Sequence, residues 1–341
     1  MIFVSRLAAA ATVTLRPACP ASMAILMTAS AHEPAPPLGP ARPALRAFRG
    51  QRPIRAGSLL LTIFGDAIAP RGGEVALASL IALCQPFGIS ERLVRTSIGR
   101  LAKDGWLQAS RSGRSSFYRL TARGRGEFDL ATRRIYGAAA TEWSGCWTLL
   151  LMFQLRAPER AALGEALKWR GFGQPMPGIL AYPADRLREI EEELAKSPAG
   201  RRVLCIRGPS GAPAEDRALA QHAWDLAELE QRYRRFVRLF GPIQRSLSRQ
   251  AIAPAACFVI RTLLIHEYRR IHLRDPLLPA NLLPPTWPGA EASALCRKIY
   301  GAVFSGAEAF LTLHGATRAG TLPQAAPETL RRFGGLDLPT G

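Results

Sequence analysis

Residues 90–120 read SERLVRTSIGRLAKDGWLQASRSGRSSFYRL, and two local patterns follow one another in this stretch. Ser90 is a residue type that often caps a helix N-terminus. Apolar residues then recur at the i, i+4, i+7 spacing of an amphipathic helix, namely Val94, Ile98 and Leu101. Gly105 ends that pattern, and two short runs on either side of the turn pair Ser112-Gly113 indicate a β-hairpin. The stretch therefore predicts a helix over 90–103 that is followed directly by a hairpin.

The polar side of this helix and the hairpin tip, residues 110–116, share a composition suited to DNA. On the helix the candidate contacts are Ser90, Arg92, Arg95, Thr96, Gly99, Arg100 and Lys103. On the hairpin they are Arg111, Ser112, Arg114 and Ser115. Arginine reads guanine with two hydrogen bonds, threonine meets a methyl group or a phosphate, and glycine permits close approach in the major groove. A basic face on one helix can also be a solvated surface, but the hairpin after it favours DNA binding.

Two helical segments precede this stretch. Residues 58–68 and about 75–85 carry apolar side chains at helical spacing, and Pro86-Phe87-Gly88 forms a tight turn before the third helix. Three helices followed by a hairpin is the order of a winged helix-turn-helix. We therefore predict a winged helix DNA-binding domain over residues 58–121.

The net charge of the chain also indicates a polyanionic partner. The 341 residues include 45 Lys and Arg against 26 Asp and Glu, which gives a formal net charge of +19. Such a charge is hard to explain for an enzyme of small molecules, but it is ordinary for a protein that meets nucleic acid or an anionic membrane. Because no apolar run approaches the about 20 residues of a membrane helix, we expect double-stranded DNA as the partner and no membrane.

The first 57 residues lack the composition of a folded domain. They hold seven Arg and one Glu and are rich in Pro and Ala, so we predict a disordered basic tail over 1–57. An alternative is a signal peptide, because the uncharged run Leu7–Leu15 follows Arg6. Met23 and Met27 also offer internal starts, so the sequence leaves open whether the residues before them are translated.

Beyond the hairpin the pattern becomes mixed and then helical. A linker helix is expected over 122–141, and a β-α-β-α-β order over 142–210 is typical of a ferredoxin-like domain. Residues 211–315 indicate a helical effector or dimer domain with a break at Gly241-Pro242, and 316–341 a flexible C-terminal tail. The expected fold class is α+β multidomain, with an N-terminal winged helix-turn-helix, a middle ferredoxin-like α/β domain and a helical C-terminal domain.

Motifs for enzymatic or metal chemistry are missing from the sequence. His266-Glu267 would need a second histidine four residues after the first to form a zinc-protease pair, but Arg270 occupies that position. The five His and six Cys are scattered and show no C-x-x-C spacing. No catalytic residue, metal ligand or cofactor is therefore predicted.

Separated segments of the chain resemble the PaaX repressors, which control phenylacetate degradation. The segments are Ser58–Val75 (SLLLTIFGDAIAPRGGEV), Glu91–Ser97 (ERLVRTS), Asp104–Leu107 (DGWL), Arg261–Arg270 (RTLLIHEYRR), Leu273–Pro276 (LRDP), Leu282–Pro284 (LLP) and Trp287–Gly289 (WPG). The similarity covers about Ile54 to Leu313, and the tail before it departs from the family pattern. The resemblance implies a cytoplasmic repressor whose DNA binding is relieved by phenylacetyl-CoA. It also implies a ferredoxin-like middle domain with dimer contacts, so we expect a homodimer on a dyad operator.

Polar residues on the otherwise apolar segment 261–275 are the candidate effector site. They are Arg261, His266, Arg269, Arg270 and Arg274. Arginine binds phosphate with two hydrogen bonds, so these side chains could hold an acyl-CoA effector. The alternative is a network of Arg–Asp and His–Glu pairs that ties helices together. A second basic cluster, defined by Arg232, Arg234, Arg235 and Arg238, could face an anionic ligand, DNA or water.

Two other functions are alternatives to a repressor. An acyl-CoA-handling enzyme with a DNA-binding appendage would need a nucleophile or an acid–base pair, and the sequence offers neither. A nuclease of ferredoxin-like type would need clustered acids to hold a metal ion. The acidic cluster Glu189, Glu191, Glu192 and Glu193 instead winds around a predicted helix, which is typical of a solvated surface.

Overall fold

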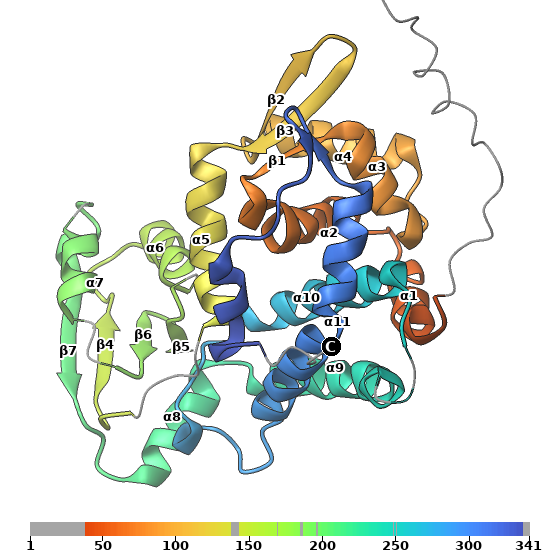
Figure 1. Cartoon of the computed structure of the whole chain (residues 1–341). Helices are drawn as coiled ribbons and strands as arrows, with labels where there is room; N and C mark the ends of the chain where they lie inside the picture. The colour runs from red at the N-terminus through yellow and green to blue at the C-terminus, as the bar shows by residue number, and fades with distance from the viewer. Residues whose placement is uncertain are drawn as a thin grey trace, which may run out of the picture. The chain divides into compact units, whose positions relative to one another are not determined.

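The computed structural model describes residues 38–137, 143–168, 170–184, 187–195, 197–247, 249 and 251–336, and it shows an α+β protein. Helices and antiparallel sheets alternate along the chain (Figure 1). Within these residues, no helix is both long enough and apolar enough to cross a membrane.

The N-terminal part contains helices around a small antiparallel sheet. Its helices are α1 Arg42–Arg49, α2 Ala56–Ile63, α3 Leu77–Cys84, α4 Glu91–Lys103 and α5 Ala122–Tyr136. Its strands are β1 Glu74–Ala76, β2 Leu107–Ser112 and β3 Ser115–Leu120, in the order β1-β3-β2. The expected helix over 90–103 and the hairpin after it are both confirmed.

Local chemistry explains where α4 and the hairpin begin and end. The Ser90 hydroxyl oxygen accepts a hydrogen bond from the Leu93 backbone N–H at 3.4 Å, which caps the start of α4. Val94, Ile98 and Leu101 are buried, as their spacing predicts. Gly113 has a φ of +56° at the hairpin turn, a backbone region that glycine enters without steric cost.

The middle part is a four-stranded antiparallel sheet with helices between its strands. The elements are β4 Trp147–Leu151, α6 Ala157–Lys168, β5 Gly173–Met176, β6 Ile179–Tyr182, α7 Leu187–Leu194 and β7 Leu204–Gly208. The strand order is β5-β6-β4-β7. The sequence predicted three strands here, and the structure adds β5, which is short and pairs with β6 across a register shift.

The C-terminal part is built from α8 Pro213–Ala223, α9 Leu226–Leu247, α10 Pro254–His272 and α11 Gly289–His314. Helix α10 is the central element: every side chain from Ala255 to His266 is buried, and the helix packs against α11, α9 and α2 (Figure 1). Helix α9 continues through Gly241-Pro242, so the break predicted there is wrong.

The prediction of a disordered tail over 1–57 is wrong for residues 38–57, whereas residues 1–37 lie outside the described part. Helix α1 buries Ala44, Leu45 and Phe48, and the Phe48 ring meets Phe87 edge to face at 6.3 Å between centroids. Three of the eight residues of this helix are arginines, but its three buried apolar side chains fall on one face. Burial of that face against α10 and the turn before α4 stabilises the helix.

The prediction of a flexible tail over 316–341 is wrong for residues 316–336, and 337–341 lie outside the described part. After α11 the chain forms the short hairpin β8 Ala316–Thr317 and β9 Gly320–Thr321, and then helical turns over Pro327–Gly334. Arg332 and Phe333 are buried in the core. The few buried side chains of this short polar segment, Thr329, Arg332 and Phe333, make too weak a pattern to be recognised from sequence.

Candidate nucleic-acid interface

Helix α4 exposes the polar face that the sequence assigned to DNA. All of the candidate residues on it are exposed: Ser90, Arg92, Arg95, Thr96, Gly99, Arg100 and Lys103. The Arg95 guanidinium forms a 2.7 Å ion pair with Glu91 one turn earlier, and both side chains are more than half exposed. The Thr96 hydroxyl donates a 2.8 Å hydrogen bond to the Arg92 carbonyl oxygen. A polyanion can displace such an exposed pair at little cost, because surface ion pairs contribute little stability.

The hairpin places a second set of polar residues at its tip. Arg111, Ser112, Arg114 and Ser115 are all exposed. The strands pair in register from Leu107 opposite Leu120 to Ser112 opposite Ser115. Figure 1 shows the tip reaching beyond the helices of the N-terminal part. Helix α4 packs on β2, so the exposed helix face and the hairpin lie next to each other.

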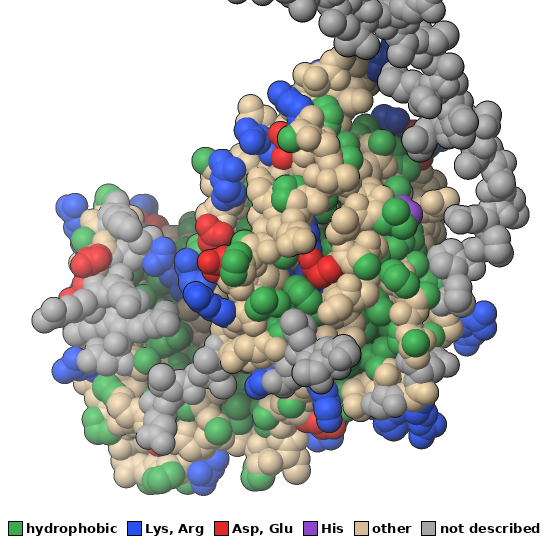
Figure 2. All heavy atoms as spheres, in the orientation of Figure 1, with side chains coloured by type: hydrophobic (Ala, Val, Ile, Leu, Met, Phe, Trp, Pro, Cys, Tyr) green, Lys and Arg blue, Asp and Glu red, His purple; other side chains and the backbone are tan. Residues whose placement is uncertain are grey.

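Charge is unevenly distributed in this region. Residues 90–116 contain six basic side chains and two acidic ones, Glu91 and Asp104, a net charge of 6 − 2 = +4. On the face of the molecule drawn in Figure 2, basic side chains lie mainly along the margins and acidic side chains are fewer. The positive charge of α4 and the hairpin tip suits a phosphate backbone.

Arg49 of α1 supports the turn before α4, and the sequence analysis missed this role. Its Nε donates a 3.1 Å hydrogen bond to the Phe87 carbonyl oxygen, and its Nη2 donates to that of Pro86 at 3.0 Å. Arg49 therefore fixes the segment that leads into the exposed helix. A short basic helix in a Pro- and Ala-rich segment gives no sequence signal for such a contact.

The structure places most of the candidate effector residues in the protein interior. Arg261 is 1% exposed and bound to carboxylates, and His266 is fully buried with its Nδ1 3.1 Å from the Thr62 hydroxyl. Arg269 donates to the Thr62 hydroxyl at 2.8 Å and to the Ser58 carbonyl at 2.7 Å. Arg261 ties α10 to Asp66 and to Glu308 of α11, whereas His266 and Arg269 tie it to α2. The assignment of these three side chains as effector ligands stays a prediction. Their contacts are of the kind that the network alternative describes, with Thr62 rather than a glutamate as the partner of His266.

Of the remaining two effector candidates, Arg270 lies in the last turn of α10 and Arg274 just after the helix. Arg270 is partly buried and pairs with Glu267 at 3.2 Å, and Arg274 is exposed. In the second basic cluster, Arg232 and Arg234 pair with Glu228 and Glu230 one turn earlier on α9. Such paired side chains are typical of a solvated helix surface.

Asp66 is the centre of the buried network. Its carboxylate is 2.7 Å from Arg261 Nε and 2.7 Å from Arg332 Nη1, and it accepts hydrogen bonds from the hydroxyls of Tyr136 at 2.6 Å and Tyr300 at 2.9 Å. Four elements and the C-terminal segment thus meet at one carboxylate. Removing one partner from such a cluster leaves a buried charge with less compensation, which is destabilising.

Burial and nearby charges change the protonation of these groups. Burial alone would raise the pKa of Asp66, but the positive charges of Arg261 and Arg332 and the Tyr136 hydroxyl hold it below its ordinary value. Burial, together with the positive charges of Arg269, Arg270 and Arg55, lowers the pKa of His266 well below its ordinary value. Burial also lowers the pKa of Arg269 to about 10, so it stays charged at neutral pH. His266 is therefore neutral and Asp66 is ionised in the folded protein.

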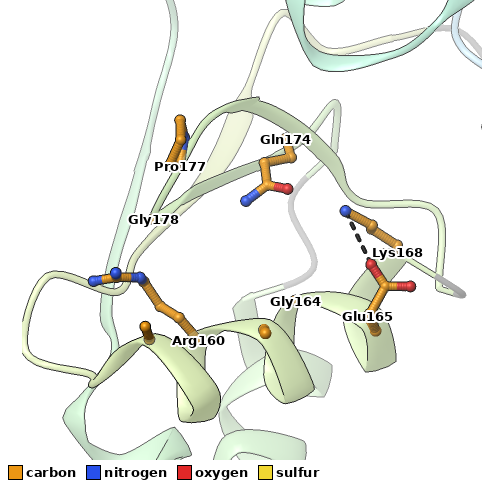
Figure 3. Close-up of a pocket in the computed structure, with 9 residues that line it drawn as sticks. Arg160, Gly164, Glu165, Lys168, Gln174, Pro177 and Gly178 are labelled. Atoms are coloured by element: carbon orange, nitrogen blue, oxygen red, sulfur yellow. Dashed lines mark hydrogen bonds and ion pairs between the residues drawn. The ribbon is translucent and has the colours of Figure 1, made fainter.

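A pocket of about 270 Å³ lies in the middle part, between α6 and the turn that joins β5 to β6. Figure 3 shows Arg160 and Lys168 from α6 with Gln174 and Gly178 across from them. Lys168 pairs with Glu165 at 3.1 Å, and Arg160 donates to the Leu155 carbonyl at 3.1 Å. The described residues contain no group of three or more His, Cys, Asp or Glu side chains that could hold a metal ion.

Comparison with known proteins identifies the family. Residues 55–124 match the family described as PaaX-like protein, and residues 224–313 match its C-terminal domain. The chain is 38% identical over 291 residues to Transcriptional repressor PaaX of Escherichia coli (strain K12). The aligned region covers 84% of this chain and 92% of that protein.

A solved structure of an uncharacterized protein from Mycobacterium tuberculosis is also similar to this chain, with 28% sequence identity and a TM-score of 0.45. The match covers 68% of this chain and 89% of the chain in that structure. The family matches include α2, α3, α4 and the hairpin at one end and α9, α10 and α11 at the other. From the curated relative and the two family matches, the protein is a regulator rather than an enzyme, and the chain belongs to the PaaX family of transcriptional repressors.

Proposed function

We propose that this protein is a cytoplasmic, homodimeric repressor of phenylacetate catabolism, and that α2 to β3 form a winged helix-turn-helix that binds operator DNA. The observation that carries the proposal is the exposed basic face of α4 beside an exposed basic hairpin tip, in a chain of the PaaX family. In this reading α4 is the recognition helix and the β2–β3 hairpin is the wing.

The arginines of α4 and those of the wing tip have different roles in the proposed complex. Arg92, Arg95 and Arg100 on α4 enter the major groove, where arginine distinguishes guanine by two parallel hydrogen bonds. Gly99 lets the helix approach the base edges because it has no side chain. Arg111 and Arg114 at the wing tip contact phosphates or the adjacent minor groove, which adds affinity with little sequence preference.

The middle part is the proposed dimer contact. Its β-α-β-β-α-β order supports a ferredoxin-like domain. Strand β7 lies at an edge of the sheet, and Leu204 and Ile206 on it are 48% and 44% exposed. Exposed apolar side chains on an edge strand favour pairing with another chain. A second copy of this protein would give the two-fold symmetry that a dyad operator requires.

Release from DNA is proposed to follow binding of phenylacetyl-CoA to the C-terminal part. The candidate phosphate contacts are Arg270, which is partly buried in the last turn of α10, and Arg274, which is exposed just after it. A difference of about 1–3 kcal/mol in effector affinity between the two protein states would change DNA affinity about 5- to 150-fold. Helix α10 joins α2 through buried polar contacts, so a ligand at its end could bias the DNA-binding part.

The proposal is tested by selecting duplexes from a random-sequence pool with the full chain. The selected duplex is then titrated by fluorescence anisotropy with and without phenylacetyl-CoA. We expect a dyad sequence, tight binding that weakens with salt, and at least fivefold weaker binding with the thioester than with free coenzyme A. Failure to enrich any sequence would overturn the DNA-binding assignment. An enriched sequence whose affinity is insensitive to the thioester would overturn only the choice of effector.

A further inference from the structure

The hairpin β8–β9, which follows α11, is attached to the same group of elements as α4 and the β2–β3 hairpin. The Ala316 N–H donates a 2.9 Å hydrogen bond to the Ser79 hydroxyl of α3. The Arg318 N–H donates to a carboxylate oxygen of Glu74 on β1 at 3.3 Å. A little further on, the Ala326 N–H donates to the Pro70 carbonyl at 2.9 Å. The dark blue hairpin of Figure 1 and the segment after it are thus attached to the N-terminal part at several points.

The chain bends at Gly315, between α11 and the β8–β9 hairpin, and there is no space at this position for a side chain. Gly315 is buried directly after α11, and a Cβ atom there would lie 2.6 Å from the Leu311 carbonyl oxygen and 2.9 Å from the Leu322 side chain. Real Cβ atoms are not found that close to backbone atoms, so the bend needs glycine. The direction of the β8–β9 hairpin is therefore set by the end of α11.

The side chain of Arg318 crosses the face of the three-stranded sheet. It starts beside Glu74 on β1, its guanidinium carbon lies 5.4 Å from the centre of the Phe117 ring on β3, and its Nη2 donates a 2.6 Å hydrogen bond to the Ser110 hydroxyl on β2. Ser110 and Phe117 are directly opposite each other in the β2–β3 ladder. One arginine from the C-terminal part therefore contacts both strands of the β2–β3 hairpin at the same cross-strand pair.

Phe117 is also the last residue at which strand β1 supports the β2–β3 hairpin. Strand β1 pairs with β3 at Arg119, Tyr118 and Phe117, and its register stops there. Beyond Phe117 the two strands pair with each other, Arg111 with Ser116 and Ser112 with Ser115. A two-stranded hairpin is marginally stable in water, so its tip needs a fixed base to keep one direction. Arg318 provides a hydrogen bond and a cation–π contact at that base.

We propose that Arg318 is a positioning residue for the tip of the β2–β3 hairpin, and that it acts on DNA binding through Ser110 and Phe117. This inference rests on the proposed function, because it assigns the hairpin tip to DNA. It adds the C-terminal hairpin to the elements that shape the DNA-binding surface, a role that lies outside the helix and wing themselves.

Hydrogen exchange of the full chain tests the contact without DNA. Arg318→Ala is compared with wild type and with Arg331→Ala, an exposed arginine of the same C-terminal segment. We expect faster exchange in peptides covering 107–120 in Arg318→Ala, unchanged exchange in Arg331→Ala, and the same melting temperature in all three proteins. Unchanged exchange of the 107–120 peptides in Arg318→Ala would overturn the proposal.

Titration of the duplex selected by the wild-type protein tests the consequence. We expect Arg318→Ala to weaken binding roughly three- to tenfold and to flatten its salt dependence. Ser110→Ala should weaken binding by less, and the double variant should bind no more weakly than Arg318→Ala, because Arg318 acts through Ser110. Additive losses would show that Arg318 contacts DNA by itself and would overturn the positioning role. If the wild-type protein selects no duplex, the proposed function fails, whereas the exchange experiment still decides whether Arg318 holds the hairpin.

Discussion

We expect Arg95 to contribute to base preference and Arg114 to sequence-independent affinity for DNA. Substituting each residue alone separates the two contributions. Arg95 lies on the exposed face of α4, and Arg114 lies at the hairpin tip. We expect Arg95→Ala to lose about 1–3 kcal/mol of operator affinity and to relax base preference at one position, because arginine reads a base edge. Arg114→Ala should weaken all sequences alike and reduce the salt slope by about one. Titrations against single-base variants of the selected duplex measure both effects, and unchanged base preference in Arg95→Ala would contradict the role of α4.

Arg261 forms ion pairs with carboxylates in the interior, and its removal tests whether it is a structural residue. The Asp66 carboxylate is 4% exposed and loses a direct ion-pair partner when Arg261 is replaced by alanine. We expect Arg261→Ala to lower the free energy of unfolding by about 3–5 kcal/mol, because it removes one of the two arginines that compensate the buried Asp66 carboxylate. The exposed Arg274→Ala is the control and should change stability by less than about 0.5 kcal/mol. Urea unfolding monitored by circular dichroism measures both, and a loss below 1 kcal/mol in Arg261→Ala would argue for a role in ligand binding instead.

His266 makes stability depend on pH. Its pKa in the folded protein lies well below its ordinary value of 6.5, so below that pH the unfolded chain binds a proton that the folded protein does not. Stability should therefore fall as pH drops from 7 to 5. His266→Gln should flatten this slope without abolishing it, because the pKa of His272 is also lowered by burial. Urea midpoints at pH 7, 6 and 5 measure the slope, and identical slopes for the two proteins would contradict the buried neutral state of His266.

Helix α1 shows how an element within a polar segment becomes part of the core. We expect Phe48→Ala to destabilise the protein by about 3–5 kcal/mol, because Phe48 packs against Phe87 and His266. Phe153→Ala is the matched control, since Phe153 is 65% exposed, and its effect should stay within about 0.5 kcal/mol. Thermal and urea unfolding report the difference. Equal stability of both variants would mean that residues 42–49 do not pack as a helix.

Helix α9 illustrates a local signal that tertiary packing overrides. Pro242 lacks a backbone N–H and usually interrupts a helix, which is why the sequence predicted a break there. The helix continues to Leu247, and Phe236, Phe240 and Ile243 on its inner side are all buried. Burial of these side chains against α10 and α11 outweighs the loss of one backbone hydrogen bond.

At the scale of the whole molecule, the edge of the middle sheet should decide the oligomeric state. We expect the wild-type protein to sediment as a dimer, and the double variant Leu204→Asp, Ile206→Asp to sediment as a monomer with an unchanged circular dichroism spectrum. Two carboxylates on β7 would be buried against the second copy at high cost. The control is Leu130→Asp, because Leu130 is 58% exposed on α5, outside the sheet. A dimer that survives the double substitution would exclude β7 as the contact.

Periodicity within single elements was enough to predict α4, the hairpin after it and the apolar centre of α10. The i, i+4, i+7 spacing of Val94, Ile98 and Leu101 reports local geometry, and the DNA-facing residues are on the opposite side of the same helix. The candidate interface could be assigned for this reason: it consists of exposed side chains on elements that are adjacent in sequence.

The buried network around Asp66 and the folding of the two terminal segments could not be predicted from local sequence patterns. Asp66 binds Arg261, 195 residues away, and Arg332, 266 residues away. A charged residue in a sequence looks the same whether it faces solvent, a ligand or an interior partner, so the arginines of α10 resembled a ligand site. Only the packing of α10 against α2 and α11 brings the carboxylates to them, because a buried charge persists only where its counter-charge is supplied by another part of the chain.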